Sequence, residues 1–552
     1  MKRAQPLVIA IVGTLLRLAL VLRDPIAIDR LFMPDDAYYT LTIARSIGRG
    51  HGPSMDGVHL TNGFQPLLAF LLVPMPSVRA ALTIGAISDG VTAYCLSRLA
   101  RRLGGTEIAA FVGALVWALS PSAIATSMNG LETSLSIACL AVALVGFDEQ
   151  RRWVGAVLGL CLLARVDSVF FVAAMGVALV RRDGIGAAVR HAGLAAIVVA
   201  PWWIYSLAHF GTFVPESGAA VRDQAMMYRE TGLVVRDQLA WAAGAVVGPP
   251  FVDLTFLRQI LGGTASGVGM VVAVGLMGGA GYLMWRRPAA PIAILTVHAL
   301  CIFTFYALYL PATWFFRRYL VPVHLLTALI VAVRVTRHRA WLAWPIVAAV
   351  SIAPFYFSSP AITPDQGHHG AKGYLVPARE ILDHAPAKAV IGSLQSGALS
   401  WLATEQRIVN LDGVVDRDAR TALETRTLGA FAQARGVTHL ADWDVNVKRF
   451  RERAGASAPT LRRIYEASRQ GQDEAFVLYE VTWPDGPADL RGAGLRPVHV
   501  VEHQLDLAER GRLLDEAGAD DVEKRVVEAG PRGAGQQDDA GGLLGKDGMK
   551  GQ

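Results

Sequence analysis

The chain has 552 residues, of which 53% are hydrophobic and 18% are charged, and its formal net charge is +6. Soluble globular proteins carry about 25% charged residues, so this composition excludes an ordinary soluble enzyme. The apolar residues form long runs, and arginines gather in the short breaks between them. The positive charge is therefore explained by membrane topology rather than by nucleic-acid binding. The sequence predicts a polytopic α-helical membrane protein.

About eleven apolar segments are long enough, or nearly long enough, to cross a bilayer. In chain order they cover residues 7–22, 80–96, 108–119, 131–147, two short helices within 154–180, 192–207, 268–285, 292–310, 320–333 and 341–357. Lys2 and Arg3 place the N-terminus in the cytoplasm, and the arginine-rich breaks then fall on the cytoplasmic side. The first loop, a long segment at 209–263 and everything after residue 358 are expected outside.

Beyond the last predicted span, short strands alternate with helices. Helices are predicted at 374–384 and 418–434, and strands at 389–392, 408–411, 437–441 and 476–480. This alternation is typical of a small α/β domain. We therefore expect a transmembrane domain at 1–357, an extracytoplasmic α/β domain at 358–484, and a disordered tail at 485–552, where too little apolar area is available to offset the ordering entropy.

Two adjacent acids, Asp35 and Asp36, follow the first predicted span. An amphipathic helix predicted at 37–47 begins directly after them, and an aspartate can cap such a helix. One acid is enough for a cap, however, and carboxylates at a membrane edge are costly to place. We expect the pair to have a chemical role, with helix capping as the alternative. An apolar segment at 64–76 is too short to span and is expected to lie at the interface or to form the bent start of the next helix.

Further acids and arginines lie at the outer ends of the predicted spans. They are the run Asn129 to Thr133, Arg165 with Asp167, Glu216, and Arg317 with Arg318. Polar residues at helix ends often only reach toward the interface, but their repetition at one face predicts a shared cavity. A carboxylate there can deprotonate a hydroxyl, and arginines can hold a phosphate leaving group. The membrane supplies lipid-borne substrates and the outer compartment lacks nucleotide sugars, so sugar transfer from a polyprenyl-phosphate carrier fits.

Several stretches resemble a known superfamily. They are Met33-Pro34-Asp35-Asp36-Ala37-Tyr38-Tyr39-Thr40-Leu41-Thr42-Ile43-Ala44-Arg45, Gly50-His51-Gly52-Pro53, Thr61-Asn62-Gly63-Phe64-Gln65-Pro66-Leu67, Asn129-Gly130-Leu131-Glu132-Thr133, Arg165-Val166-Asp167 and parts of 392–416. Together they resemble the bacterial integral-membrane glycosyltransferases of the GT-C superfamily, which includes protein O-mannosyltransferases and mycobacterial arabinofuranosyltransferases. The resemblance covers residues 1–480 and is most specific in the first loop.

The resemblance implies a polyprenyl-phosphate sugar donor, inversion at the anomeric carbon and a catalytic acid in the first outer loop. Carried onto this chain, Asp35 is the general base, Asp36 positions it or contacts the acceptor, and Glu132 is a second acid. Arg317 or Arg318 would hold the donor phosphate. The other residues expected to bind substrate are Tyr38, Tyr39, Arg45, Asn62, Arg165 and Asp167.

The implied partners are the lipid-linked donor, membrane lipid and a glycan, lipid or protein acceptor, with no nucleic acid. Some relatives use a divalent metal, but the sequence shows no tight ligand cluster, so no metal site and no other cofactor is assigned. The expected location is the plasma (inner) membrane, with a cytoplasmic N-terminus and with the active site and the C-terminal domain outside.

Two other classes of function stay open at this point. A transporter or lipid flippase would use the outer-face acids for coupling, and it would need acids near mid-bilayer and two related halves. Asp89 is the clear acid inside a predicted span, and no internal repeat is evident. A non-catalytic scaffold would explain the segment 374–480 but not the pair Asp35-Asp36.

Overall fold

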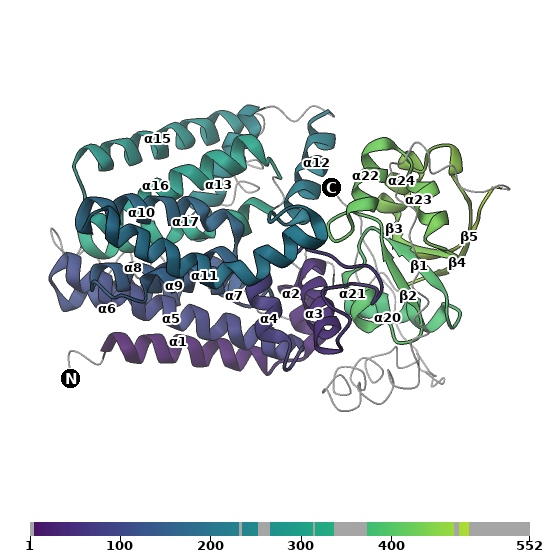
Figure 1. Ribbon diagram of the computed structural model, residues 1–552, viewed down its shortest axis with the longest axis horizontal. Helices are drawn as coiled ribbons and strands as arrows, with labels where there is room; N and C mark the ends of the chain where they lie inside the picture. The colour runs from purple at the N-terminus through teal and green to yellow at the C-terminus, as the bar shows by residue number, and fades with distance from the viewer. Residues whose placement is uncertain are drawn as a thin grey trace, which may run out of the picture.

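The computed structural model describes residues 5–230, 235–251, 265–312, 315–335, 373–467 and 474–484. A bundle of helices forms one end of the molecule, and a sheet flanked by helices forms the other (Figure 1). The predicted span at 341–357, the domain boundary at 357–358 and the tail 485–552 lie outside the described residues.

Long helices run side by side in the bundle (Figure 1). They are α1 (Gln5–Val21), α5 (Val78–Gly104), α6 (Glu107–Ala118), α8 (Thr133–Asp148), α9 (Val154–Ala164), α10 (Val169–Asp183), α11 (Ile185–Phe210), α13 (Val235–Phe251), α15 (Ala265–Trp285), α16 (Ala290–Thr304) and α17 (Phe316–Ile330). The π-helical turns η3 (Phe305–Tyr309) and η5 (Val331–Val335) extend the last two. Every bundle helix except α13 lies over a predicted apolar segment, so those helices are confirmed.

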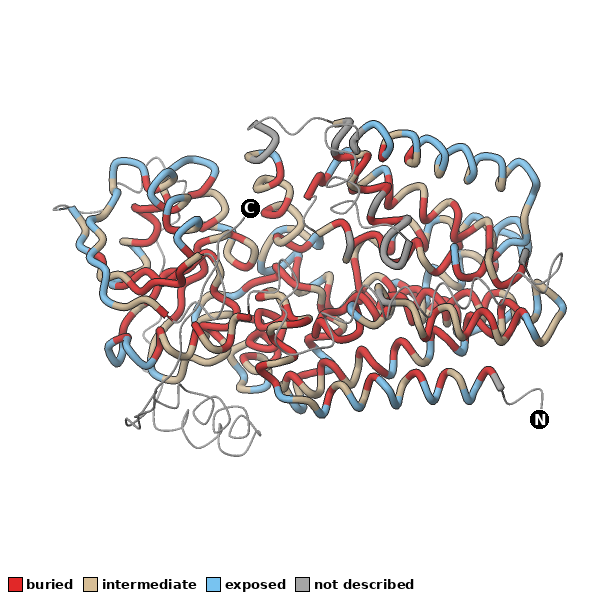
Figure 2. Tube along the Cα trace, turned by 180° about the vertical axis from the view of Figure 1, so that it is seen from behind, coloured by how far each residue is buried: buried red, intermediate tan, exposed pale blue. Residues whose placement is uncertain are grey.

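The number of spans is a separate matter. Among the described residues, four helical stretches are long and apolar enough to cross a membrane, namely Val78–Gly104, Ile185–Phe210, Gly267–Trp285 and Ala290–Tyr309, and a fifth is added if α1 and the short helix bent 110° from it count as one. The prediction of about eleven spans therefore stays a prediction. Large apolar side chains such as Ile197 and Val271 face outward, and Figure 2 shows exposed residues all along α15. Such an apolar exterior suits lipid better than water.

The long segment after α11 differs from the prediction. It forms α12 (Glu216–Glu230) and α13, and α13 packs against α15 and α17 inside the bundle. Buried alanines, including Ala240 and Ala243, line this contact, and small residues of this kind let helix backbones approach closely. The prediction of a wholly outer segment at 209–263 is thus wrong for 235–251. The first residues of α13, which include Arg236 and Asp237, are polar and lower the mean hydropathy of the segment. The sequence pattern therefore does not indicate the apolar face of this helix.

Short helices cover the end of the bundle that faces the sheet. They are α2 (Pro25–Leu31), α3 (Asp35–Gly48), α4 (Pro66–Leu72), α7 (Pro121–Ser127) and the 3-10 turn η1 (Val166–Ser168). The amphipathic helix predicted at 37–47 is α3, and the interfacial segment contains α4. The break predicted between two short helices is η1, which separates α9 from α10. The helix at 37–47 and the break between the two short helices are confirmed, while the placement of 64–76 at the membrane interface stays a prediction.

The other end of the molecule is a five-stranded mixed sheet in the order β2-β1-β3-β5-β4. The strands are β1 (Val390–Ser393), β2 (Arg407–Asn410), β3 (His439–Trp443), β4 (Thr460–Glu466) and β5 (Phe476–Thr482), and the helices are α20 (Leu375–His384), α21 (Gly397–Leu402), α22 (Arg417–Thr425), α23 (Leu428–Ala434) and α24 (Asp444–Arg453). β1 runs parallel to β2 and β3, whereas β5 is antiparallel to β3 and β4. Four of these strands were predicted. The edge strand β4 was not, because it is largely exposed and carries two arginines.

Helix α3 joins the two ends. Its apolar residues Ala37, Tyr38 and Leu41 share one hydrophobic cluster with Leu375 of α20 and Leu399 of α21. Side chains on the opposite face of the sheet, such as Phe431 and Phe450, form a core of their own. The α/β part is therefore seated directly on the helix that carries Asp35 and Asp36.

Candidate active site

A cavity of about 1250 Å³ lies where the helical bundle meets the α/β part. Its walls come from α3, α12, α17, the turns before α8 and α10, and the loops that follow β1 and β2. One part of the wall is apolar, with Phe170, Phe305 and Val321 among its residues, while acids, arginines and tyrosines line the rest. The cavity thus offers both an apolar surface and a charged one.

Arg165 forms one charged centre of the cavity, and it is almost fully buried between α9 and η1. Its Nη1 donates to Glu132 at 2.8 Å, and its Nη2 donates to Asp167 at 2.8 Å and to the Tyr306 hydroxyl at 3.1 Å. The Tyr306 hydroxyl donates in turn to Asp167. One guanidinium is therefore held by two carboxylates, which fix its position and compensate its charge.

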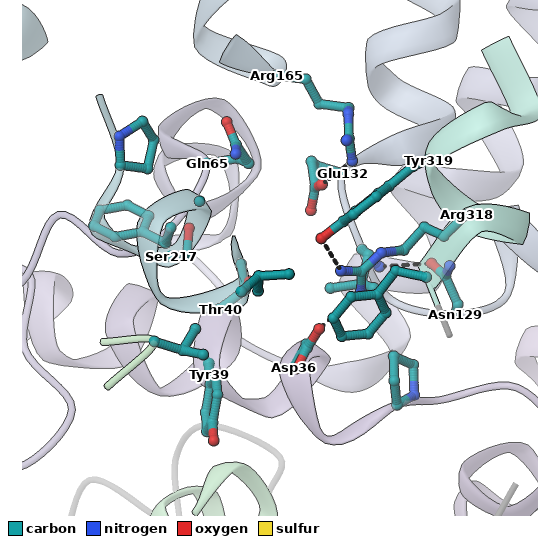
Figure 3. A pocket seen from close by; sticks show the side chains of 18 of the residues that line it. Asp36, Tyr39, Thr40, Gln65, Asn129, Glu132, Arg165, Ser217, Arg318 and Tyr319 are labelled. Atoms are coloured by element: carbon teal, nitrogen blue, oxygen red, sulfur yellow. Dashed lines mark hydrogen bonds and ion pairs between the residues drawn. The ribbon is translucent and has the colours of Figure 1, made fainter. Parts of the chain in front are cut away.

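Arg318 forms a second charged centre at the start of α17. Its Nη1 donates to Asp36 at 2.9 Å, and its guanidinium lies 4.4 Å from the ring centre of Phe315 and 5.1 Å from that of Tyr319. Arg165 lies 5.1 Å from the same Tyr319 ring. Figure 3 shows Arg165, Tyr319 and Arg318 in sequence along the cavity wall, with Asp36 below them. The side chain of Asp36 stays 31% exposed.

Asp35 has different surroundings from its neighbour. It is 4% exposed, and its two carboxylate oxygens accept the backbone N–H groups of Gly397 and Ala398 at 2.8 and 2.9 Å. Neither acid caps its own helix, because the N-cap of α3 is Pro34. The capping alternative is thus wrong for α3, and Asp35 instead binds the first N–H groups of α21. Burial raises the pKa of Asp35 to about 7, against the two backbone N–H groups, which lower it.

Tyr39 and Asp412 line the side of the cavity formed by the α/β part. The Tyr39 hydroxyl donates to Asp412 at 3.0 Å, and the N–H of Val414 donates to the other carboxylate oxygen at 2.7 Å. Burial raises the pKa of Asp412 to about 7. These bonds fix the loop after β2 against α3.

The structure brings most of the predicted site residues together. Asp35, Asp36, Tyr39, Glu132, Arg165, Asp167 and Arg318 all line the cavity. Tyr38, Arg45 and Asn62 do not. Tyr38 donates to Asp29 at 2.6 Å, Arg45 donates to the carbonyls of Ser400 and Trp401, and Asn62 donates to Ser206. The side chain of Arg317 lies outside the described part of the chain.

Sequence reasoning missed several residues of the wall, including Tyr306, Tyr319 and Arg222. The two tyrosines stand near the ends of apolar runs, where a hydroxyl is a usable signal of a polar neighbour. Arg222 belongs to the segment that was expected to be a loop, and its guanidinium lies 4.6 Å from the ring centre of Tyr309. Asp412 falls within the stretch 392–416, for which no site residue was predicted.

Among the described residues, no three His, Cys, Asp or Glu side chains gather as a metal-binding set. The cavity carboxylates are held by guanidinium, hydroxyl and backbone N–H groups instead.

No protein-family model and no curated protein sequence matches the chain at a significant level. Among solved structures, ArnT from Cupriavidus metallidurans bound to undecaprenyl phosphate is similar, with 12% identity and a TM-score of 0.53 over 86% of this chain and 97% of that one. The apo form of the same protein gives 13% identity and a TM-score of 0.49 over 84% and 97%. At this level of identity the similarity concerns the fold. The chain therefore has the fold of ArnT.

Proposed function

We propose that the protein is a membrane glycosyltransferase that moves a sugar from a polyprenyl-phosphate donor to a hydroxyl group of an extracytoplasmic acceptor, with inversion. The observation that carries this proposal is the single cavity in which Asp36, Arg318 and Arg165 lie beside an apolar wall. Charged groups next to an apolar surface suit a ligand with a phosphate head and a hydrocarbon chain. The fold shared with ArnT, which has been seen with undecaprenyl phosphate, supports the same ligand class.

Arg318 is the better candidate for the donor phosphate. The charge of Arg165 is already balanced by Glu132 and Asp167, whereas the ion pair of Arg318 is with Asp36 alone among the described residues. The buried Nε of Arg318 also has no hydrogen-bond partner in the described part of the chain. A guanidinium with a spare donor can bind a phosphate oxygen without first losing another bond.

The geometry favours Asp36 over Asp35 as the general base. Both oxygens of Asp35 accept backbone N–H bonds, so we propose that Asp35 positions α3 while Asp36 accepts the proton. This exchanges the roles that the resemblance implies. In the reaction, the acceptor oxygen bonds to the anomeric carbon as its proton passes to Asp36, and the bond from that carbon to the phosphate oxygen breaks. Arg318 stabilises the charge that the leaving phosphate gains.

Donor binding would also activate the base. An ion-paired carboxylate is a weak proton acceptor, and in the described structure Asp36 is paired with Arg318. A donor phosphate bound to Arg318 takes over that pairing and leaves Asp36 free for the acceptor hydroxyl. The acceptor class stays broad, as a glycan, a lipid or a protein.

We further propose that the cavity opens on the outer side of the inner membrane, with the N-terminus in the cytoplasm. The start of α1 and the α/β part lie at opposite ends of the bundle (Figure 1), and the arginine-rich breaks support this orientation. The transporter alternative gains no support from Asp89, because this acid is held by Arg17 at 2.8 Å and by Trp117.

The test is donor binding and turnover by the purified protein in detergent, with a radiolabelled polyprenyl-phosphate sugar. Arg318→Gln should weaken donor binding about 10- to 100-fold, the loss of one charge-assisted contact, and Arg318→Lys should restore part of it. Arg462→Gln, on the exposed strand β4, is the matched control and should bind normally. Absence of donor binding by the unaltered protein would overturn the proposed function, and normal binding by Arg318→Gln would overturn the role of this arginine.

A further inference from the structure

A second, smaller cavity lies farther along α3, toward its C-terminal end, than the active-site cavity. Its volume is about 60 Å³, and α3, the first outer loop and the α/β part all contribute to its wall. Thr42, Arg45, Ser46 and Arg49 line it from α3, with the i, i+3, i+4, i+7 spacing of one helix face. The two cavities share no lining residue, so the smaller one is a separate site.

The wall of this cavity is rich in positive charge. Three arginines line it, Arg45 and Arg49 from α3 and Arg407 from the start of β2, together with His51. Among its described lining residues the one acid is Asp56, which is already bound to His59 Nδ1 at 2.6 Å and to the N–H groups of Val58 and His59. The cavity therefore favours an anion.

Polar groups without partners surround the same cavity. The hydroxyls of Thr42, Ser46 and Ser400 and the Nε of Arg407 are buried and have no hydrogen-bond partner in the described part of the chain. Buried polar groups in folded proteins are nearly always hydrogen-bonded. A single unpaired group would need no explanation, but four around one small cavity indicate a ligand. All four can donate a hydrogen bond, which is what the oxygens of an anion require.

The size of the cavity limits the ligand. A water molecule needs about 10–15 Å³ of such volume, so the cavity holds a group of about four to six heavy atoms. This matches a phosphate group and is too small for a sugar ring. Arg45 and Arg407 already donate to backbone carbonyls, so the guanidiniums mainly supply positive charge. The Nε of Arg407 and the three hydroxyls supply the donors. Positive charge with several donors suits a tetrahedral oxyanion with two negative charges better than a single carboxylate.

We propose that this cavity binds a phosphate group, either inorganic phosphate or the headgroup phosphate of an anionic lipid. Bound there, the phosphate bridges Ser46 of α3 and Ser400 with Arg407 of the α/β part, so it adds a link between the two ends of the molecule. The site lies apart from the proposed catalytic cavity, and it can exist whether or not the protein transfers sugars.

The test uses the purified full-length protein in dodecyl maltoside micelles, which contain no phosphate. Inorganic phosphate is titrated at constant ionic strength against sodium chloride, and the shift of the unfolding temperature is followed. In a second arm phosphatidylglycerol is titrated against diacylglycerol. A saturable shift with inorganic phosphate identifies free phosphate as a ligand, and a shift with phosphatidylglycerol alone identifies the lipid headgroup; either result supports the site.

Variants locate the binding. Arg407→Gln should weaken phosphate binding about 10- to 100-fold, and Ser400→Ala, which removes a hydroxyl and keeps every charge, provides a milder variant if Arg407→Gln does not fold. Arg318→Gln removes any phosphate binding at the proposed donor site, so the shift that remains in this variant reports on the smaller cavity. The surface control Thr421→Ala should leave the shift unchanged. Three results would each overturn the proposal. The first is no saturable shift with either probe, and the second is loss of the shift in Arg318→Gln instead of Arg407→Gln. The third is an equal shift in every variant, which would mean an adventitious ion only.

Discussion

Two polar regions meet on α3, and they use similar residues differently. In the active-site cavity, Asp36 and Glu132 bind the side chains of Arg318 and Arg165. At the junction with the α/β part, Asp35 binds backbone N–H groups of α21. A substrate can replace a side-chain partner by a small movement, but it cannot replace a backbone partner without breaking the start of a helix. The partner of a charged group, rather than its position in a motif, therefore separates catalytic candidates from residues that hold the fold.

The largest effect should come from Asp36→Asn, which removes the proposed general base from the active-site cavity. The amide keeps the shape but cannot accept the hydroxyl proton, and general-base catalysis contributes roughly two to four orders of magnitude in rate. We expect kcat for sugar transfer to fall by that amount while donor binding and the unfolding temperature stay close to normal. If the variant still binds donor and transfers sugar at more than a tenth of the normal rate, Asp36 is not the general base.

Gly397→Ala breaks the junction without touching a charge. A Cβ at this position would lie 2.2 Å from the backbone oxygen of Asp35 and 2.9 Å from its carboxyl group, so α3 and α21 must move apart. We expect a loss of about 1–3 kcal/mol in unfolding free energy, as for other overpacked sites, measured by denaturant or thermal unfolding. Gly193→Ala on α11 is the matched control, since no atom lies within 4 Å of its added Cβ, and its stability should not decrease.

Asp35→Asn weakens the same junction more gently. The amide oxygen can still accept one of the N–H groups of Gly397 and Ala398, but the amide nitrogen cannot accept the other, so one hydrogen bond is lost. The expected cost is about 1 kcal/mol of unfolding free energy, and transfer measured on folded protein should fall less than tenfold. If Asp35→Asn abolishes transfer while Asp36→Asn does not, the assignment of the base is reversed.

Much of the fold follows from the sequence because apolar runs and arginine-rich breaks are local signals. The same reasoning found α3, η1 and four strands. It missed α13, whose polar start masks a packed alanine face, and β4, which lies exposed at a sheet edge. It also could not separate Asp35 from Asp36, because the residues that bind Asp35 stand more than 360 positions away in the chain. Gly63 is a second example of a contact between residues far apart in the sequence, because its backbone lies against Val414 of the α/β part.

The smallest effect concerns pH at the junction. Burial raises the pKa of Asp412 from 3.8 to about 7. The folded protein thus holds this proton more tightly than the unfolded chain, so the contribution to stability is full below about pH 4 and is lost as the pH rises through 7. Asp412→Asn removes the titrating group. The measured quantity is the unfolding temperature of the unaltered protein minus that of Asp412→Asn. This difference should decrease as the pH rises from about 5 to about 8. The effects of most other ionisable groups on the unfolding temperature cancel in it, because both proteins contain them. A difference that is constant or grows with pH would show that Asp412 is ionised throughout, held as a carboxylate by Tyr39 and the N–H of Val414.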